Sequence, residues 1–351
     1  MNKPKVLAYY LPQFHVIKEN NQWWGDGFTE WTALNNAEIY IHTQNIRKPT
    51  APFFQYELPN KEVMEWQAKL ASSHNIDGFF IWDYWFGKGK TLLNKPKEYI
   101  RDQNLSFPYA LIWANHSWYN KAINKLLIQQ EYLGSQDYKR YCLDCMTHFE
   151  KDTYIKIDNR PIFGIFMPKD IPDLDIFIDI FNDTAIAHGF DGIYWVAENT
   201  SVSNIFSTSF DTIVNSSTYF SERRKIHPIE FIKEQLIRKL GLDFIGPLVY
   251  DYEKMVTRKD KFETSENPVI FTGWDTTPRH GIRGTILKNF NESNFEKHVD
   301  HVLSHTIEND TSLIIIKSWN EWAEGNILEP DGVFGDSLLK IFKNKFKFYF
   351  G

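Results

Sequence analysis

The stretch LIIIKSWNEWAEG, residues 313–325, joins an apolar run directly to two acids, Glu321 and Glu324. The run at 313–316 has the length and the aliphatic, β-branched composition of a strand that is buried on both faces. In a barrel of parallel strands, the residues just past the carboxyl end of each strand converge on one face, where the active site lies. The stretch therefore predicts a buried last strand and places two acids at its functional end.

The rest of the chain repeats this pattern of a buried strand followed by a helix. The expected strands are residues 6–10, 78–84, 109–115, 161–167, 192–197, 212–215, 269–274 and 313–318. Helical runs such as 61–75 and 295–309 lie between them, with apolar residues at spacings of three and four. Eight strands are the number that a closed parallel barrel needs. We predict the α/β class and a single (β/α)8 TIM barrel over residues 1–351.

Two connections in this pattern are long. Residues 11–60 form a connection rich in tryptophan and glycine, and long connections of this kind are often functional. We expect this loop to cap the active site at the carboxyl ends of the strands. Residues 216–267 are expected to insert helices before the seventh strand.

The composition narrows the class of partner. Of the 351 residues, 42% are hydrophobic and 24% are charged, which argues against disorder. The net charge of -6 and the lack of a basic stripe argue against nucleic acid as a partner. The aromatic share of 16% is high, and aromatic faces suit the apolar face of a sugar ring. We expect an oligosaccharide or polysaccharide as substrate.

The two acids have the chemistry that cleavage of a glycosidic bond requires. One carboxyl must protonate the departing oxygen while another supplies charge from the opposite side. If Trp322 begins a helical turn, Glu321 and Glu324 share a face, and each raises the cost of ionising the other. The alternative is that both are solvated acids at a helix start, where the helix dipole favours them. The two flanking tryptophans favour the catalytic interpretation.

Polar and aromatic residues gather at the other predicted strand ends and in the long loop. The residues expected to contact substrate are Tyr10, Gln13, His15, Trp24, Glu30, Trp31, Asp83, Trp85, Asn115, His116, Glu198, Trp274, Asp275, Arg279, Trp319 and Asn320. His15, His42, His116 and His280 do not have the close spacing of metal ligands on one helix, and we expect neither a metal nor a cofactor.

The cysteines and the two ends of the chain favour a cytoplasmic protein without a structural metal. Cys142 and Cys145 are the only cysteines, and we expect both to be buried on a helix. No apolar run reaches the roughly 20 residues of a membrane span, and the start MNKPKVLAYYLPQFH does not resemble a signal peptide. The terminal run SLLKIFKNKFKFYFG is read as the last barrel helix, with contact to a membrane surface as the weaker alternative.

Several segments also resemble a known family. AYYLPQFH, NQWWGDGFTEW, FFIWDYWFGKGKTLLNKP, WANHSW, NRPIFGIF, FTGWDTTPRH and SWNEWAEGNILEPD look like the WbsX family, which is named for glycosyltransferases of lipopolysaccharide biosynthesis. That family resembles in turn glycoside hydrolase family 99, the endo-α-mannosidase and endo-α-mannanase barrels. The resemblance runs from the first strand to the last. The chain departs from the family pattern at His116, where that pattern has glutamate.

The resemblance implies a mechanism and assigns roles to the two acids. Family 99 enzymes retain the anomeric configuration, and the sugar's own 2-hydroxyl attacks the anomeric carbon to give a 1,2-anhydro intermediate. By motif position, Glu321 would take the 2-hydroxyl proton, and Glu324 would act as general acid and then as base for water. The leading expectation is a retaining hydrolase that cleaves an internal α-linkage of a bacterial surface polysaccharide.

Two other functions remain open at the level of sequence. The family's name supports a glycosyltransferase of lipopolysaccharide or O-antigen biosynthesis. Such transferases often carry Asp-x-Asp, and Asp173-Leu174-Asp175 matches in letters, although acids opening a helix explain it as well. The second alternative is a non-catalytic carbohydrate-binding barrel, in which the acids only accept hydrogen bonds from hydroxyls.

Overall fold

A computed structural model describes residues 3–120, 123, 125–198, 209–214, 216, 218–221, 223–256 and 266–351. Asn215, at the end of the predicted sixth strand, lies outside these residues, as do residues 217, 222 and 257–265 of the segment expected to carry an insertion.

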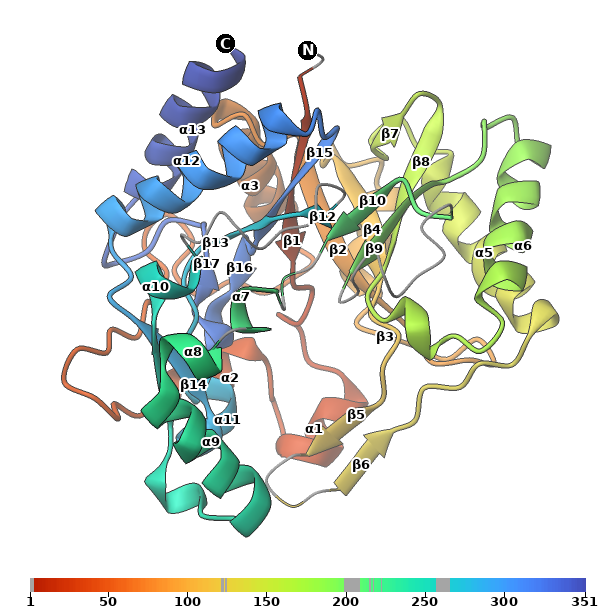
Figure 1. Cartoon of the computed structure of the whole chain (residues 1–351). Coiled ribbons are helices and arrows are strands. Elements are labelled where there is room, and N and C mark those ends of the chain that lie inside the picture. The colour runs from red at the N-terminus through yellow and green to blue at the C-terminus, as the bar shows by residue number, and fades with distance from the viewer. Residues whose placement is uncertain are drawn as a thin grey trace.

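Eight parallel strands form a nearly closed barrel with helices between them, which confirms the predicted fold (Figure 1). The strands are β1 (Lys5–Tyr10), β2 (Gly78–Trp85), β4 (Tyr109–Trp113), β8 (Arg160–Ile165), β9 (Tyr194–Glu198), β10 (Thr212–Val214), β12 (Glu266–Asn267) with β13 (Val269–Phe271), and β15 (Leu313–Lys317). All residues of β2, β4, β9 and β15 are buried. Burial on both faces explains why these segments read as continuous apolar runs.

The seventh strand closes the barrel in two short pieces. The order of pairing is β12-β10-β9-β8-β4-β2-β1-β15-β13, so the two ends of the path are pieces of one segment. Glu266 and Asn267 pair with β10, whereas Val269 to Phe271 pair with β15. Pro268 separates the pieces and has no N–H to donate to a ladder.

Helices surround the sheet, and two of the long ones begin at an asparagine cap. Outside the segment between β10 and β12, the long helices are α3 (Lys61–Ser73), α4 (Lys95–Asp102), α5 (Ser135–Phe149), α6 (Leu174–Ala187), α12 (Glu292–Glu308) and α13 (Ser337–Phe350). Asn60 accepts a hydrogen bond from the N–H of Val63, and Asn291 accepts one from Asn294. Cys142 and Cys145 are buried on α5, as expected, and Asp173 precedes the first residue of α6.

The C-terminal helix is part of the barrel wall. Leu339, Phe342 and Phe346 of α13 are buried, and the helix packs on α12. The apolar face that could have touched a membrane is thus largely covered by protein. Both termini lie at the same end of the molecule, opposite the carboxyl ends of the strands (Figure 1). In the described part of the chain, no helix combines the length and the apolar character needed to cross a membrane.

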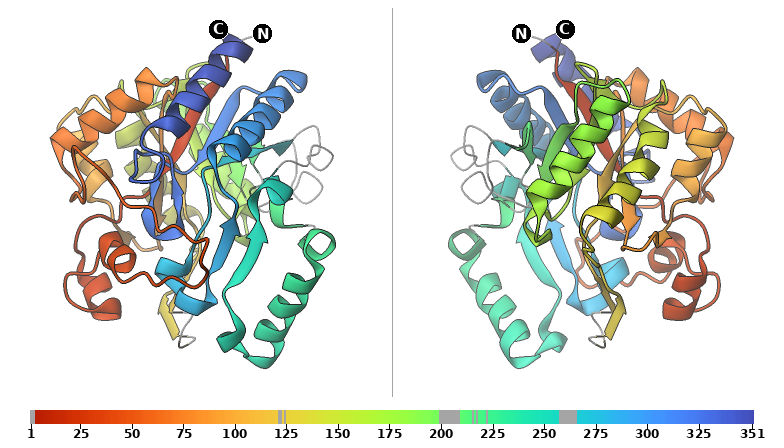
Figure 2. Two further views of the ribbon diagram at one scale, coloured as in Figure 1. Left: turned by 90° about the vertical axis from the view of Figure 1, so that its left-hand side faces the viewer. Right: turned by 90° about the vertical axis from the view of Figure 1, so that its right-hand side faces the viewer.

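The long segments gather at the carboxyl ends of the strands. Residues 11–60 contain α1 (Lys18–Trp24) and α2 (Glu30–Asn35). Between β10 and β12 lie α7 (Thr218–Ser221), α8 (Arg223–Ile226), α9 (Pro228–Leu240), the 3-10 turn η3 (Asp243–Ile245), β11 (Leu248–Asp251) and α10 (Tyr252–Val256). Figure 2 shows α9 standing away from the barrel wall.

Short elements complete this end of the molecule and the connections around it. A hairpin of β5 (Trp118–Asn120) and β6 (Lys125–Ile128) reaches out beyond the barrel (Figure 1). β11 pairs with β14 (Thr285–Lys288). β3 (Thr91–Leu92) pairs antiparallel with β2, and β7 (Lys156–Ile157) pairs antiparallel with β8. The 3-10 turn η1 (Pro168–Asp170) leads towards α6.

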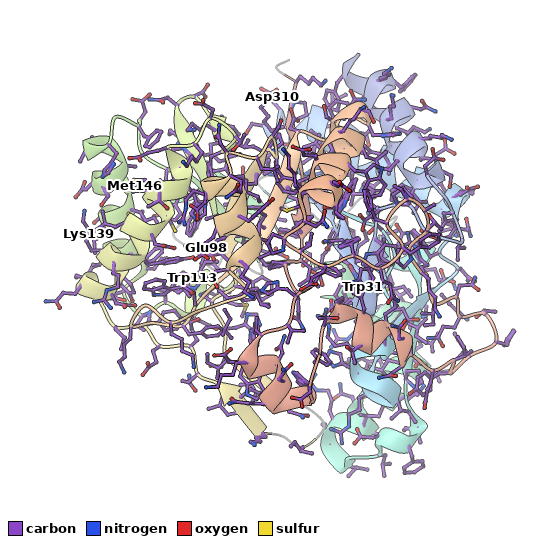
Figure 3. All side chains as sticks on the ribbon, turned by 180° about the vertical axis from the view of Figure 1, so that it is seen from behind. Trp31, Glu98, Trp113, Lys139, Met146 and Asp310 are labelled. Atoms are coloured by element: carbon purple, nitrogen blue, oxygen red, sulfur yellow. The ribbon has the colours of Figure 1, made fainter. Side chains whose placement is uncertain are left out.

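Large side chains fill the body of the molecule. The side chains of Trp31 and Trp113 lie inside it, and that of Lys139 lies at its periphery (Figure 3). Gly164 of β8 makes room for the side chains of Phe80 and Ile112. A Cβ built on Gly164 would lie 2.5 Å from Cζ of Phe80 and 2.9 Å from Cγ1 of Ile112. The ring of Phe80 occupies the volume that a side chain on Gly164 would need.

Substitution of Gly164 by alanine tests this packing. Gly164→Ala is expected to lower the free energy of unfolding by about 1–3 kcal/mol, because Phe80 and Ile112 must shift. Urea unfolding of the whole chain measures the change. Gly332→Ala is the control, since its Cβ would meet atoms no closer than 3.7 Å. Equal unfolding midpoints for the two variants would contradict the packing argument.

Candidate active site

A cavity of about 740 Å³ opens at the carboxyl ends of the strands. Of the residues that the sequence predicted to act on substrate, those that line it are Gln13, Trp24, Glu30, His116, Trp274, Arg279, Glu321 and Glu324. They come from the long loop 11–60, from the segment after β4 and from the ends of β13 and β15. The size and the mixture of aromatic and charged walls suit a few sugar rings.

A tight turn after β15 carries the two acids. Glu321 ends β16 (Asn320–Glu321), which pairs with β17 (Asn326–Ile327), and the 3-10 turn η6 (Trp322–Glu324) lies between them. Gly325 follows with φ 66°, and a Cβ there would lie 2.7 Å from the backbone nitrogen of Asp275. A larger residue at 325 would push the acid turn away from the strand-end segment that carries Asp275.

Glu321 lies in a nearly dry aromatic setting. Its side chain is 6% exposed, and Oε1 accepts a hydrogen bond of 2.9 Å from Nε1 of Trp82. Burial, followed by the nearby charge of Glu324, raises the pKa of Glu321 from 4.5 to about 7, against the opposing charges of Arg279 and Lys317. A carboxyl with this pKa can exchange a proton near neutral pH.

Arg279 holds two other carboxylates in place. Its Nη2 lies 3.0 Å from both oxygens of Glu30, and its Nη1 donates to Glu324. Glu30 is 1% exposed and also accepts a hydrogen bond of 2.8 Å from the N–H of Ala323 in the acid turn. Burial opposes the charge of Arg279, but Glu30 and Glu324 raise its pKa above the ordinary value. The guanidinium therefore stays charged and fixes the orientation of Glu324.

A buried ion pair lies beside Glu321. Lys317, the last residue of β15, lines the cavity, and its Nζ lies 5.3 Å from the ring centre of Trp274 and 3.9 Å from Oε1 of Glu198. Glu198 is fully buried and accepts hydrogen bonds from the hydroxyls of Tyr9 and Ser216. Glu198 does not line the cavity but pairs with Lys317, which does.

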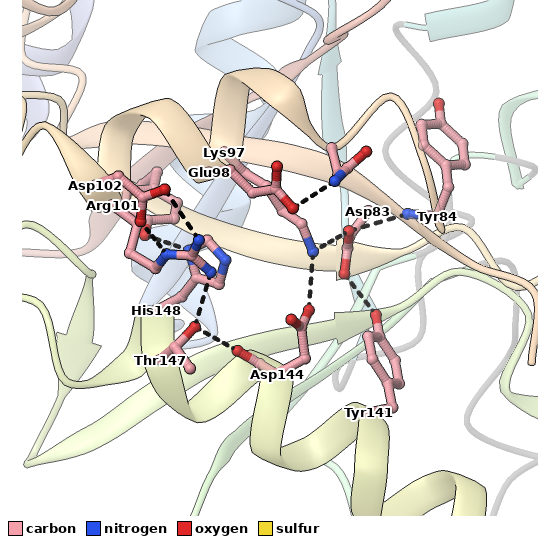
Figure 4. A network of polar contacts seen from close by, with 12 residues as sticks. Asp83, Tyr84, Lys97, Glu98, Arg101, Asp102, Tyr141, Asp144, Thr147 and His148 are labelled. Atoms are coloured by element: carbon pink, nitrogen blue, oxygen red, sulfur yellow. Dashed lines mark hydrogen bonds and ion pairs between the residues drawn. The ribbon is translucent and has the colours of Figure 1, made fainter. Parts of the chain in front are cut away.

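Strand alternation turns three other predicted contacts away from the cavity. In β2, Trp82 and Tyr84 line the cavity, whereas Asp83 bonds to Lys97 of α4 at 2.7 Å and to Tyr141 of α5 at 2.8 Å (Figure 4). Trp85 likewise donates to Asp137 of α5. Tyr10 of β1 donates to Gln67 of α3. Side chains on a strand alternate between faces, so these residues face the helix layer.

Three polar residues among the predicted contacts have structural roles outside the cavity lining, and two of them, Asn320 and Asn115, are fully buried. Asn320 bonds to both backbone groups of Leu11, and Asn115 bonds to both backbone groups of Met167. Asp275 accepts from Gln44 and Thr277. These bonds fix the loops that form the cavity walls.

Three predicted aromatic contacts also lie behind the cavity. Trp31 donates to the carbonyl of Tyr56 at 2.6 Å, and Trp319 is fully buried. His15 is 2% exposed, and burial, assisted by the charge of Lys95, lowers its pKa to about 4. His15 is therefore a neutral buried ring at neutral pH rather than a cation facing the substrate.

Sequence reasoning missed several residues that line the cavity. They are chiefly Trp82, Tyr84, Trp118, Phe166 and Lys317. Trp82 and Tyr84 alternate with Asp83 along β2. They could have been identified only if it were known which face of the strand points into the barrel. Lys317 lies four residues before Glu321, and the sequence pattern predicts only that it belongs to the last strand.

Paired carboxyls in an aromatic cavity at the strand ends of a barrel are the groups that an enzyme of carbohydrate chemistry would need. A family model described as glycosyltransferase WbsX matches residues 6–342, and the chain belongs to this family. The match confirms the resemblance seen in the sequence motifs.

Two curated relatives align with nearly the whole length of this chain. Both are proteins named uncharacterized protein WxcX from Xanthomonas campestris pv. campestris, 26% identical over 345 residues in strain B100 and 27% identical over 348 residues in strain ATCC 33913. Each alignment covers 95% of this chain and 48% of the relative, so the chain spans about half the length of the curated relatives it matches.

Solved structures share the fold at low identity. One titled glycoside hydrolase-like protein has a TM-score of 0.60 at 14% identity and covers 99% of this chain and 94% of its own. The family 99 endo-α-mannosidase from Bacteroides thetaiotaomicron has a TM-score of 0.56 at 12% identity and covers 99% of this chain and 98% of its own. Identities this low establish the common barrel alone.

The raised pKa of Glu321 predicts how its removal changes stability with pH. The folded state holds this proton more tightly than the unfolded chain, so ionisation costs stability as the pH rises from 4.5 to about 7. At pH 8, Glu321→Gln is expected to raise the free energy of unfolding by roughly 2 kcal/mol, and at pH 5 by far less. Denaturant unfolding at both pH values measures this.

The control has the opposite sign. Hydrogen bonds from Arg223 lower the pKa of Glu234, so its charge adds stability above that group's unfolded pKa. Glu234→Gln should therefore lose stability at pH 8. If Glu321→Gln is less stable than wild type at pH 8, the ionised Glu321 does not lower the free energy of unfolding, and the argument is wrong.

Proposed function

We propose that the protein is a retaining glycoside hydrolase of the family 99 type that cleaves an internal α-linkage in a bacterial surface polysaccharide. The observation that carries this proposal is the pair of carboxyls, Glu321 and Glu324, lining one aromatic cavity with Glu321 6% exposed. Burying charged groups costs folding free energy, so carboxyls kept in so dry a place mark a candidate functional site.

In the first step Glu321 acts as base. Its carboxylate takes the proton of the sugar's 2-hydroxyl as that oxygen attacks the anomeric carbon. Glu324, which must be protonated in the reactive form of the enzyme although it contacts Arg279, gives its proton to the departing glycosidic oxygen. The products of this step are a 1,2-anhydro sugar and the released half of the glycan. The pKa of about 7 matches Glu321 to this task, because a weaker base would not draw the proton.

In the second step the roles reverse. Glu324 takes a proton from water as the water oxygen attacks the anomeric carbon, and Glu321 returns a proton to the 2-oxygen as the three-membered ring opens. Two inversions at one carbon give net retention. Arg279 fixes Glu324, and the indole N–H of Trp82 fixes Glu321, so that both carboxyls are positioned before the substrate arrives.

Substitution of the acids tests the proposal. With α-linked manno-oligosaccharides, Glu321→Gln and Glu324→Gln are each expected to lower kcat about 10²- to 10⁴-fold, because each removes one proton transfer. Glu65→Gln on the exposed side of α3 is the matched control and should keep wild-type turnover. Equal turnover in all four proteins would remove both acids from the reaction.

The pH profile and the 2-hydroxyl distinguish the roles. In wild type, kcat/KM should rise with pH through about 7 as Glu321 ionises, and Glu321→Gln should lack this limb. NMR of the first product formed should show the starting anomeric configuration. A 2-deoxy substrate should bind without being cleaved, and its cleavage would contradict participation of the 2-hydroxyl.

The family's description as a glycosyltransferase favours a second candidate, transfer of a sugar in lipopolysaccharide or O-antigen biosynthesis. Calorimetry with a panel of nucleotide sugars separates the two. Tight binding of one nucleotide sugar, with no hydrolysis of oligosaccharides, would support transfer. Binding of oligosaccharides with neither reaction would instead indicate a carbohydrate-binding barrel.

A further inference from the structure

The helix α9, in the segment between β10 and β12, turns apolar side chains towards the solvent and acidic side chains towards the protein. Its outer face carries Ile229, Ile232, Leu236 and Leu240, which are 81%, 59%, 38% and 65% exposed. Spacings of three and four place them in one stripe. Phe244 of η3, just past the helix, is 74% exposed. We call these five residues the apolar stripe.

The inner face of the same helix is charged. Glu234 is 8% exposed and accepts hydrogen bonds of 2.6 and 2.9 Å from Arg223 and one of 3.0 Å from Tyr250. Glu230 pairs with Lys233 and accepts from the N–H of Val249. A surface helix ordinarily turns its apolar side inward and its charges outward. Here the polar side is satisfied by protein, and the apolar side faces out.

The exposed charges beside the stripe have one sign. Arg224, Arg238 and Lys239 are exposed. Within the described residues 223–245 every acid forms an ion pair, namely Glu230, Glu234 and Asp243, with side chains 17%, 10% and 30% exposed. Large apolar side chains flanked by cations are typical of a helix that lies in the headgroup region of an anionic bilayer. Two copies of the chain facing each other here would bring like charges together.

The stripe lies at the cavity end of the molecule. Arg283 of η5 (Gly281–Arg283) lines the cavity and pairs with Asp243 of η3, the turn that carries Phe244. Across the cavity, Tyr119 and Leu126 of the β5–β6 hairpin are 49% and 42% exposed. Both the hairpin and α9 reach out at the end of the molecule away from the termini (Figures 1 and 2).

We propose that the apolar stripe and its flanking cations dock the protein on an anionic lipid bilayer, with the cavity end towards the membrane. This surface does not depend on the reaction proposed above. It would bring the cavity to glycans held at a lipid surface.

Co-sedimentation with vesicles tests the proposal. The whole chain is mixed with vesicles of phosphatidylcholine and phosphatidylglycerol, or of phosphatidylcholine alone, and the bound fraction is measured after centrifugation. Wild type should bind the anionic vesicles, and more weakly at high salt or without phosphatidylglycerol. Ile232→Ser with Leu236→Ser should lower the ratio of bound to free protein at least about tenfold, because those side chains would no longer enter the interface.

A double variant on α6 is the matched control. Ile176 and Ile186 are 46% and 59% exposed, similar to Leu236 and Ile232, but lie on a helix away from the cavity. Ile176→Ser with Ile186→Ser should bind vesicles as wild type does. Equal losses in both double variants, or no binding by wild type, would overturn the proposal. So would a wild-type dimer that the stripe variant alone converts to monomer without vesicle binding, since a second copy would then cover the stripe.

Discussion

The charge of one guanidinium holds the candidate active site together. Arg279, on the short helix α11 (Thr277–His280) after β13, lies between Glu30 of the long loop and Glu324 of the last strand's turn. Each of these segments would otherwise bury a charge alone, which costs several kcal/mol. A planar fork with several donors can serve two carboxylates at once, and a lysine could not match both. Segments separated by 249 and 45 residues are thereby joined at one point.

This charge balance also explains why Glu321 differs from its neighbours. Arg279 directly contacts Glu30 and Glu324, whereas Glu321 has the indole of Trp82 as its hydrogen-bond donor. Burial is the main cause of the raised pKa at both Glu321 and Glu30, but at Glu30 the directly bound Arg279 and the N–H of Ala323 oppose it. Three carboxyls in one cavity thus have different environments, which is the condition for dividing proton donation from proton removal.

The barrel could be predicted from the sequence because its strands are buried on both faces and appear as uninterrupted apolar runs. The position of Glu321 and Glu324 could also be predicted, since a motif at a strand end needs only local order. The face on which each strand residue lies could not be predicted. Asp83 and Tyr10 were therefore predicted to contact substrate, whereas Trp82 and Tyr84 line the cavity. That choice depends on the phase of a strand against its helices. Contacts such as that of Lys317 with Glu198 join residues 119 positions apart and leave no local trace.

The two termini emerge together at the end of the barrel opposite the cavity (Figure 1). A fusion partner, an affinity tag or a bead attached at either terminus would therefore stand on the far side from the entrance. Immobilised in this way, the molecules would present their openings to the solution in a common orientation. The same geometry would let a tethered copy reach a large polymer that a randomly adsorbed copy could not.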